Sequence, residues 1–129
     1  MRVMHIGLAC SNEGKADRFF VDLLGLVKQE GKTIPVSITK PIFGLDSSLT
    51  AINYIGPGMH LEVFLTGGAG YQPDRVSHVC LEVENIDALL DRAAALRFTV
   101  TRIPKGDGWI VFIDDSDGHR FEIKQGVGS

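Results

Sequence analysis

Hydrophobic positions along the chain follow two periods, one typical of helices and one typical of strands. Between Gly14 and Gly25, apolar residues recur at spacings of three and four, which predicts an amphipathic helix ended by Gly25. A second stripe of this kind covers residues 86–96 and follows Asn85, a residue type that caps helix N-termini. Short runs rich in β-branched and aromatic residues follow each predicted helix and predict strands: 26–30, 49–55 and 59–65 after the first, and 99–103, 109–113 and 120–124 after the second.

The same order of elements occurs twice, and matched residues mark the repeat. His5 and His78 each lie in an apolar, strand-like run before a helix. Glu62 and Glu122 each stand between two apolar residues, four positions after a glycine. The first half carries extra residues at 31–48, where neither period is visible, so we expect a long loop there, either a lid over the site or an ordered surface loop.

The repeat predicts an α+β fold built from two tandem βαβββ modules within a single domain, residues 1–129. Module one covers about 1–66 and module two about 76–125, with a glycine- and proline-containing linker at 67–75. One helix per module covers one face of its sheet. The other face of each sheet is therefore not covered by a helix.

Side-chain alternation decides which residues lie on that other face. In residues 59–65, Leu61 and Val63 share one face, which places Glu62 on the opposite one. The same alternation places His5, His78 and Glu122 on the helix-free face of their own strands. All four residues are thus predicted to lie on faces without a helix.

Composition limits the function classes. The 129 residues are 44% hydrophobic and carry a formal net charge of −3, which disfavours binding to nucleic acid or to anionic membranes. The chain has neither an apolar run long enough to span a membrane nor a recognisable secretory signal, so we expect a cytoplasmic protein. Cys10 and Cys80 are expected to be reduced thiols in or near the core.

Two imidazoles and two carboxylates that share a face need partners, because burying such groups alone costs several kcal/mol. A divalent cation satisfies all four at once. This nitrogen and oxygen donor set suits Zn²⁺, Ni²⁺ or Co²⁺ first, and also Mn²⁺ or Fe²⁺. Four protein ligands leave positions on the ion for water or substrate, which favours a catalytic site.

The chain resembles the vicinal oxygen chelate superfamily, which includes glyoxalases, bleomycin resistance proteins and dioxygenases. The resemblance lies in His5, in Leu61-Glu62-Val63, in the run from Ser77 to Val83 around His78, and in the run from Asp115 to Ile123 around Glu122. It implies that the paired modules form a cup-shaped, incompletely closed barrel around one metal ion. It also implies a homodimer and the four metal ligands His5, Glu62, His78 and Glu122.

This ligand set is most similar to that of glyoxalase I. The resemblance therefore implies a lactoylglutathione lyase type of lyase or isomerase, which moves a proton next to a metal-bound carbonyl through an enediolate. Glu122 is the implied catalytic base and Glu62 the second candidate. A thiohemiacetal or an acyl thioester is the implied class of small-molecule substrate. Two alternatives stay open: a methylmalonyl-CoA epimerase-like enzyme, and a metal-free small-molecule binding or resistance protein.

Six further residues are candidates around this site. Arg120 and Lys124 flank Glu122 at alternate positions, where they bind either an anionic group of the substrate or neighbouring acidic side chains. Phe43 and Trp109 form either an apolar wall of the substrate site or part of the core. His60 shares the face of Glu62, as a partner of the ligands, a substitute ligand or a rim residue, whereas His119 is expected to face solvent without a role.

Overall fold

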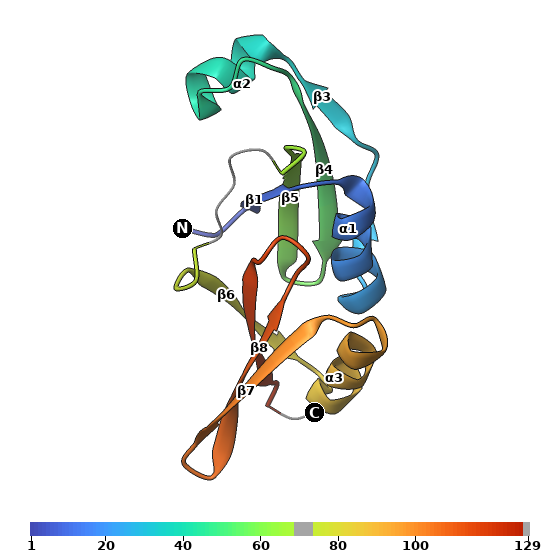
Figure 1. The fold of residues 1–129 in the computed structure, drawn as a ribbon, viewed down its shortest axis with the longest axis vertical. Helices are drawn as coiled ribbons and strands as arrows, with labels where there is room; N and C mark the ends of the chain where they lie inside the picture. Colours follow the sequence, from blue (N-terminus) through green and yellow to red (C-terminus); the bar gives the residue numbers. More distant parts are fainter. Residues whose placement is uncertain (69–73, 128–129) are drawn as a thin grey trace. The chain divides into compact units, whose positions relative to one another are not determined.

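The computed structural model describes residues 1–68 and 74–127 and divides into two compact units, Met1–Tyr71 and Gln72–Ser129 (Figure 1). Each unit begins with a strand and a helix and continues with strands, and the first unit has one further strand and helix; this confirms the predicted α+β fold of two βαβββ-type modules. The predicted linker at 67–75 lies largely outside the described residues. In the described part of the chain, no helix is long and apolar enough to cross a membrane.

The first module forms a mixed five-stranded sheet. Its strands run in the order β1-β5-β4-β2, with β3 also paired to β4, and β1 lies parallel to β5. Its elements are β1 (Ile6–Cys10), α1 (Glu13–Asp17), η1 (Arg18–Leu23), β2 (Val27–Lys28), β3 (Lys32–Ile34), α2 (Val36–Phe43), β4 (Leu49–Gly56) and β5 (Met59–Leu65).

The helix predicted between Gly14 and Gly25 is present as α1 continued by η1. Asn12 caps it, because its Oδ1 accepts a hydrogen bond from the backbone N–H of Lys15 at 2.9 Å. Gly25, at a φ of 73°, follows it in the left-handed conformation that glycine allows. The second half, η1, has the wider turn of a π-helix, which the apolar spacing did not predict.

A polar network joins this helix to the sheet. Tyr54 of β4 is fully buried, and its ring centroid lies 5.2 Å from that of Phe20. Its hydroxyl donates to Asp17 Oδ1 at 2.7 Å, and Lys28 Nζ donates to Asp17 Oδ2 at 2.9 Å. Tyr54 is paired with Leu61 across the sheet, so this is the face that the helix covers.

The predicted loop at 31–48 is wrong, because the segment contains β3 and the two-turn helix α2. Pro41 and several β-branched residues are unfavourable inside a helix, yet α2 forms between Pro35 and Gly44, which has a φ of 71°. Thr39 Oγ1 donates to the carbonyl oxygen of Ser47 at 2.7 Å and ties the helix to the strand that follows. The apolar residues Val36 and Ile42 stay exposed, so the helix gives no clear buried stripe.

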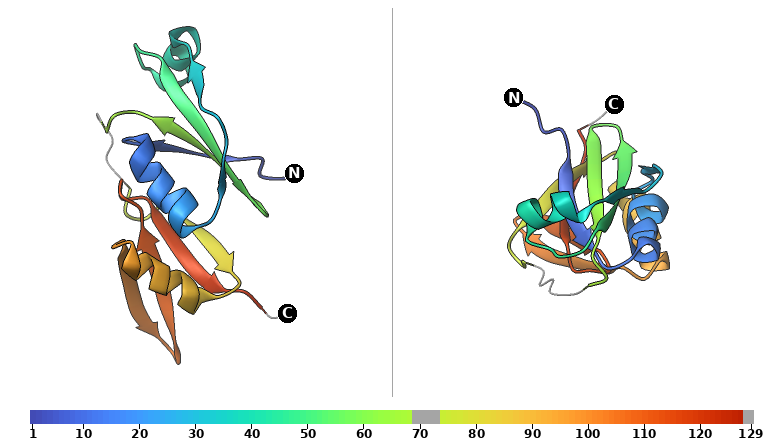
Figure 2. Two further views of the ribbon diagram at one scale, coloured as in Figure 1. Left: turned by 90° about the vertical axis from the view of Figure 1, so that its right-hand side faces the viewer. Right: turned by 90° about the horizontal axis from the view of Figure 1, so that it is seen from above.

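The second module forms a four-stranded sheet in the order β6-β9-β8-β7, with β6 parallel to β9. The predicted helix cap is confirmed, since Asn85 Oδ1 accepts from the N–H of Ala88 at 3.0 Å. Figure 2 shows the capped helix, α3 (Ile86–Ala95), against one face of the sheet. There it buries Leu89 and Ala93. The elements are β6 (His78–Val83), α3 (Ile86–Ala95), β7 (Thr99–Lys105), β8 (Gly108–Asp114) and β9 (Arg120–Gln125).

The two cysteines differ in their surroundings, and neither forms a disulfide. Cys10 is buried, as expected. Cys80 is exposed, so its predicted place near the core is wrong. It alternates with Val79 and Leu81 along β6 and therefore lies on the face that the helix does not cover.

We predict that Tyr54→Phe lowers the free energy of unfolding by about 1–2 kcal/mol, because the buried hydrogen bond to Asp17 is lost. Burial, and next the hydrogen bond to Asp17, raise the pKa of Tyr54 above its ordinary value. Above about pH 10 the unfolded wild type loses this proton while the folded state keeps it, so wild-type stability falls as pH rises.

Urea denaturation of wild type and Tyr54→Phe at pH 7.5 and above pH 10 measures the two unfolding free energies. The gap in unfolding free energy between wild type and Tyr54→Phe should narrow at high pH. A gap that stays constant or widens with pH would contradict the proposed role of the buried hydroxyl.

Candidate metal centre

Module one brings His5 and Glu62 together on the sheet face opposite α1 and η1. Glu62 lies in the middle of β5 and is paired across the sheet with Gly7 of β1, so His5, two residues before Gly7, falls on the same face. The distance between His5 Nε2 and Glu62 Oε1 is 4.0 Å. Both side chains stay partly accessible, at 48% and 29%.

Module two repeats this arrangement more tightly. His78 begins β6, and Glu122 lies in β9 opposite Cys80 and Phe112. The distance between His78 Nε2 and Glu122 Oε1 is 3.3 Å. The alternation predicted from the sequence therefore brings one imidazole and one carboxylate together in each module.

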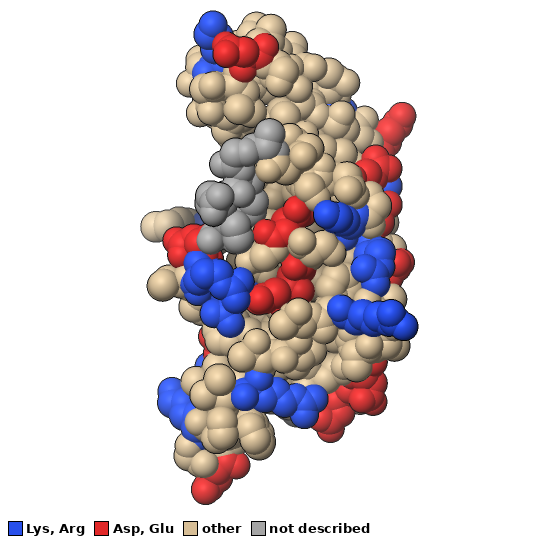
Figure 3. Space-filling model, in the orientation of Figure 1, with Lys and Arg blue, Asp and Glu red and all other residues tan. Residues whose placement is uncertain are grey.

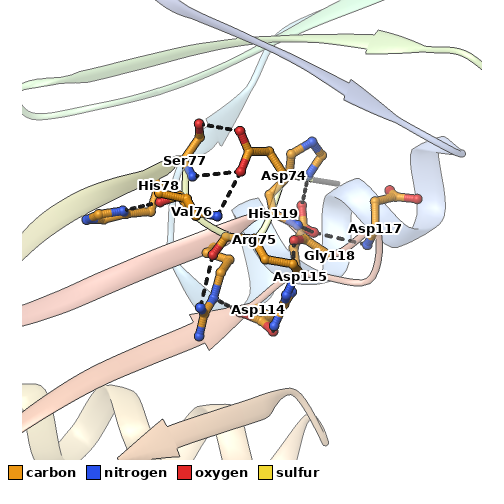
Figure 4. Close-up of polar contacts among 11 residues, drawn as sticks. Asp74, Arg75, Val76, Ser77, His78, Asp114, Asp115, Asp117, Gly118 and His119 are labelled. Atoms are coloured by element: carbon orange, nitrogen blue, oxygen red, sulfur yellow. Dashed lines mark hydrogen bonds and ion pairs between the residues drawn. The ribbon is translucent and has the colours of Figure 1, made fainter. Parts of the chain in front are cut away.

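The proton on His78 is assigned by a backbone carbonyl. His78 Nδ1 lies 2.8 Å from the carbonyl oxygen of Val76, which only accepts hydrogen bonds, so Nδ1 carries the hydrogen (Figure 4). In the neutral ring, Nε2 then directs a lone pair toward the carboxylate of Glu122. Two lone-pair donors at 3.3 Å repel each other unless a cation or a proton lies between them.

The donor set fits a divalent metal ion. Nitrogen and carboxylate ligands lie about 2.0–2.2 Å from such an ion, so two ligands of one ion are roughly 3–3.5 Å apart. His78 and Glu122 already satisfy this spacing, and His5 and Glu62, at 4.0 Å, lie slightly farther apart. A hydrogen bond from Nδ1 to a carbonyl is also the usual second contact of a metal-binding histidine.

His60 is a neighbour of the first pair. It shares the face of Glu62, and its ring centroid lies 5.8 Å from that of His5. Its Nε2 lies 2.7 Å from Oδ1 of Asn53, a residue paired with Glu62 across the sheet. Because an amide oxygen only accepts, Nε2 carries the hydrogen in His60. The tautomer is therefore opposite to that of His78.

Arg120 and Lys124 lie on either side of Glu122. The guanidinium carbon of Arg120 is 4.4 Å from the centroid of the Phe112 ring, and its Nε donates to Asp114 Oδ1 at 3.4 Å. Lys124 Nζ lies 3.9 Å from Glu122 Oε2. Arg120 thus forms the expected salt bridge while it stays on the face of Glu122.

The two aromatic candidates lie in different surroundings. Phe43 of α2 contacts Phe64 edge to face at a centroid distance of 5.1 Å, and Phe64 is on the face of Glu62. Trp109 instead lies on the same face of β8 as Val111, the face that packs against the helix. The Trp109 side chain is 63% exposed. The structure therefore does not bring Trp109 to the face of Glu122.

The expectation that His119 faces solvent without a role is wrong. Its side chain is 9% exposed, and Nδ1 lies 2.7 Å from Asp115 Oδ2. The other carboxylate oxygen of Asp115 accepts from the backbone N–H groups of Asp117 and His119, at 3.0 and 2.8 Å (Figure 4). This network fixes the turn before β9, the strand that carries Glu122. The Asp-rich turn in the sequence was the available signal.

Charges of both signs are interspersed over the described residues on the face shown in Figure 3. Lysine and arginine do not gather there into one basic patch. This distribution agrees with the net charge of −3.

A family model for the Glyoxalase/Bleomycin resistance protein/Dioxygenase superfamily matches residues 2–123, nearly the whole chain. The chain belongs to this superfamily. No curated protein matches this chain significantly.

Solved structures of a glyoxalase family protein, a glyoxalase I and a fosfomycin resistance protein share the fold. A glyoxalase family protein from Enterococcus faecalis is 18% identical, with 95% of each chain covered and a TM-score of 0.70. Glyoxalase I from Leishmania major is 19% identical and covers 97% of this chain and 86% of its own, with a TM-score of 0.71. A mutant of the fosfomycin resistance protein FosX from Listeria monocytogenes is 16% identical and covers 97% and 92%, with a TM-score of 0.75.

Nitrogen-15 NMR of this protein without metal at pH 8 tests the tautomers of His78 and His60. We predict that neutral His78 carries its hydrogen on Nδ1 and that neutral His60 carries it on Nε2, because of their respective acceptors. The nitrogen shifts distinguish the two forms directly. A protonated Nε2 in His78 would contradict the claim that its lone pair is directed toward Glu122.

Proposed function

We propose that the chain is a divalent-metal-dependent lyase or isomerase of the glyoxalase type. In this proposal His5, Glu62, His78 and Glu122 hold one cation, each module supplying one imidazole and one carboxylate. The observation that carries it is the 3.3 Å distance between His78 Nε2 and Glu122 Oε1, with Nδ1 of the same ring held by the carbonyl oxygen of Val76. The chain belongs to a superfamily whose members include metal-dependent enzymes, which supports the same interpretation.

One cation per chain is expected whether its two half-sites belong to one chain or to two copies in the proposed homodimer. Zn²⁺, Ni²⁺ and Co²⁺ suit the nitrogen and oxygen donors best, with Mn²⁺ and Fe²⁺ as further candidates. When bound, such an ion supplies positive charge where an oxygen of the substrate becomes negative.

Glu122 is the proposed base. Its Oε1 faces His78 while its Oε2 lies 3.9 Å from Lys124 Nζ, so the two oxygens have different neighbours. One oxygen can hold the cation while the other accepts a proton from the carbon next to a carbonyl group.

Glu62 is the second candidate base and keeps an epimerase open. A methylmalonyl-CoA epimerase-like enzyme removes a proton on one side of a carbon and returns one on the other, which needs two groups. The matched position of Glu62 in module one supplies the second carboxylate. A lyase whose base is Glu122 needs the same carboxylate only as a ligand, so the two activities differ in what Glu62 must do.

Substrate anchors are proposed from the residues around each pair. Arg120 stacks on Phe112 beside Glu122, and Lys124 flanks it, so both can bind an anionic group. The Listeria FosX mutant was solved with Mn(II) and 1S,2S-dihydroxypropylphosphonic acid, a ligand that has such a group. Trp109 is not part of this proposal, because it lies on the other face of β8.

Metal titration tests the ligand set. Wild-type protein should bind close to one Zn²⁺ or Ni²⁺ per chain, and His78→Ala should weaken binding by about 100-fold or more, because a ligand is lost. Cys80→Ala is the matched control, since Cys80 lies on the same face of the same strand. Equilibrium dialysis with metal analysis measures the stoichiometry and the affinity for wild type and for each variant.

Full-affinity binding by His78→Ala would contradict the proposed ligands. Wild-type protein that takes up less than about 0.1 equivalent of every metal tried would favour the metal-free binding protein instead.

Turnover and proton exchange test the base. With the methylglyoxal–glutathione hemithioacetal we expect lactoylglutathione, and with an epimerase we expect deuterium at C2 of methylmalonyl-CoA in heavy water. Glu122→Gln should lower the rate by about 10²–10⁴-fold, because the proton acceptor is lost. Glu82→Gln, on the same sheet face, is the control and should keep the wild-type rate. Normal turnover by Glu122→Gln would remove Glu122 from the mechanism.

A further inference from the structure

Module one contains an apolar pocket of about 260 Å³ on the sheet face opposite α1 and η1. Strands β1, β4 and β5 form its floor, and the segment after β3 forms its wall. Phe43 and Leu45 reach it from the end of α2 and the residues beyond. Its other lining side chains include Leu49, Phe64 and Thr66, and Gly7 contributes backbone.

The floor of this pocket adjoins a proposed metal ligand. Gly7 is the partner of Glu62 across β1 and β5, and Phe64 follows Glu62 two positions later on the same face. A Cβ atom on Gly7 would lie 3.3 Å from Cε2 of Phe64, so the absence of a side chain lets this ring lie against the strand. A group in the pocket would therefore lie beside the position where Glu62 acts.

Two contacts outside the sheet position the wall. Thr39 Oγ1 donates to the carbonyl oxygen of Ser47 at 2.7 Å, which holds the residues between them in a closed turn. Gly44 ends α2 in a left-handed conformation, and its N–H donates to the carbonyl oxygen of Lys40 at 2.9 Å. Phe43 and Leu45 flank this glycine. The turn thus presents both side chains to the pocket, while Phe43 remains 46% exposed.

Size and chemistry define what the pocket takes. Cavities of about 150 Å³ lined by apolar side chains bind benzene, so this pocket accommodates a phenyl ring or a branched alkyl group. Thr66 is the one polar side chain among its lining residues in the described part of the chain. A charged or strongly hydrated group would lose its water without replacement there.

Resting on the proposed function, we propose that this pocket binds an apolar substituent, aryl or branched alkyl, on the carbonyl compound that the metal site transforms. The segment at 31–48 then sets substrate specificity through Phe43 and Leu45. Carbonyl substrates with a large apolar group should be preferred over those with a methyl group. Ring burial against Phe43 and Phe64 supplies the preference.

The first test uses metal-free protein, so it does not depend on the metal site. Benzyl alcohol is titrated into protein with carbon-13 leucine methyl groups. Saturable shifts are expected at Leu45 and Leu49 and not at Leu96, which lies in the other module. Phe43→Ala should weaken the binding several-fold. Ile42→Ala, a neighbour on α2 that does not line the pocket, is the matched control and should leave it unchanged.

The second test uses zinc-loaded protein and two hydroxamates that differ only in the substituent. Benzohydroxamate should bind at least about tenfold more tightly than acetohydroxamate, because only its ring fills the pocket. Leu45→Trp, which fills the pocket, and Phe43→Ala, which removes its wall, should each reduce this ratio. Ile42→Ala should keep it. Calorimetry gives both affinities.

Equal affinities for the two hydroxamates in wild type, or a ratio that Leu45→Trp and Phe43→Ala leave intact, would overturn the proposal. The absence of benzyl alcohol shifts at Leu45 and Leu49 would overturn it as well, even in an active enzyme. Benzyl alcohol shifts in a protein that binds no metal would instead refute the proposed function and support the pocket as an apolar binding site.

Discussion

The site depends on side-chain alternation in two sheets, each of which has one face packed against a helix that follows its first strand. Along β5, Leu61 and Val63 are buried under the helix while Glu62, between them, lies on the other face. A register slip of one residue would exchange these roles and destroy both core and site. Contacts that fix the register therefore support the chemistry. Tyr54 with Asp17 joins helix to sheet in module one, and in module two Gln125 Oε1 accepts from the N–H of Ile86 at the start of α3.

Much of this arrangement could be predicted from the sequence, because it follows from local period. The alternation that predicted Glu62 and Glu122 on helix-free faces is visible in the apolar residues beside them. The same rule applied to Trp109 and Val111 would have placed Trp109 on the helix side. Helix α2 was missed because its apolar residues stay exposed and Pro41 argued against it. The hydrogen bond from His78 to Val76 depends on the path of a turn, which the sequence does not encode in any period.

The two modules have the same fold and different surroundings for their histidine and glutamate. In module two, Arg120 and Lys124 place positive charge around Glu122. In module one, His60 and Asn53 lie beside Glu62, and the apolar pocket under Phe43 adjoins it. One duplicated framework thus supplies a matched imidazole and carboxylate in each module, while the residues around them differ in chemistry. In the proposed function this difference suits a substrate with one anionic part and one apolar part, and it arises in part from the extra residues at 31–48.

The central claim is that the duplicated faces supply two imidazoles and two carboxylates to one cation. X-ray absorption spectroscopy of the zinc-loaded protein at the zinc edge tests it most directly, because imidazole rings give a distinct multiple-scattering signal. The account predicts a shell of nitrogen and oxygen atoms at about 2.0–2.2 Å with two imidazoles and no sulfur. A sulfur ligand, or a spectrum fitted by one imidazole or none, would contradict it.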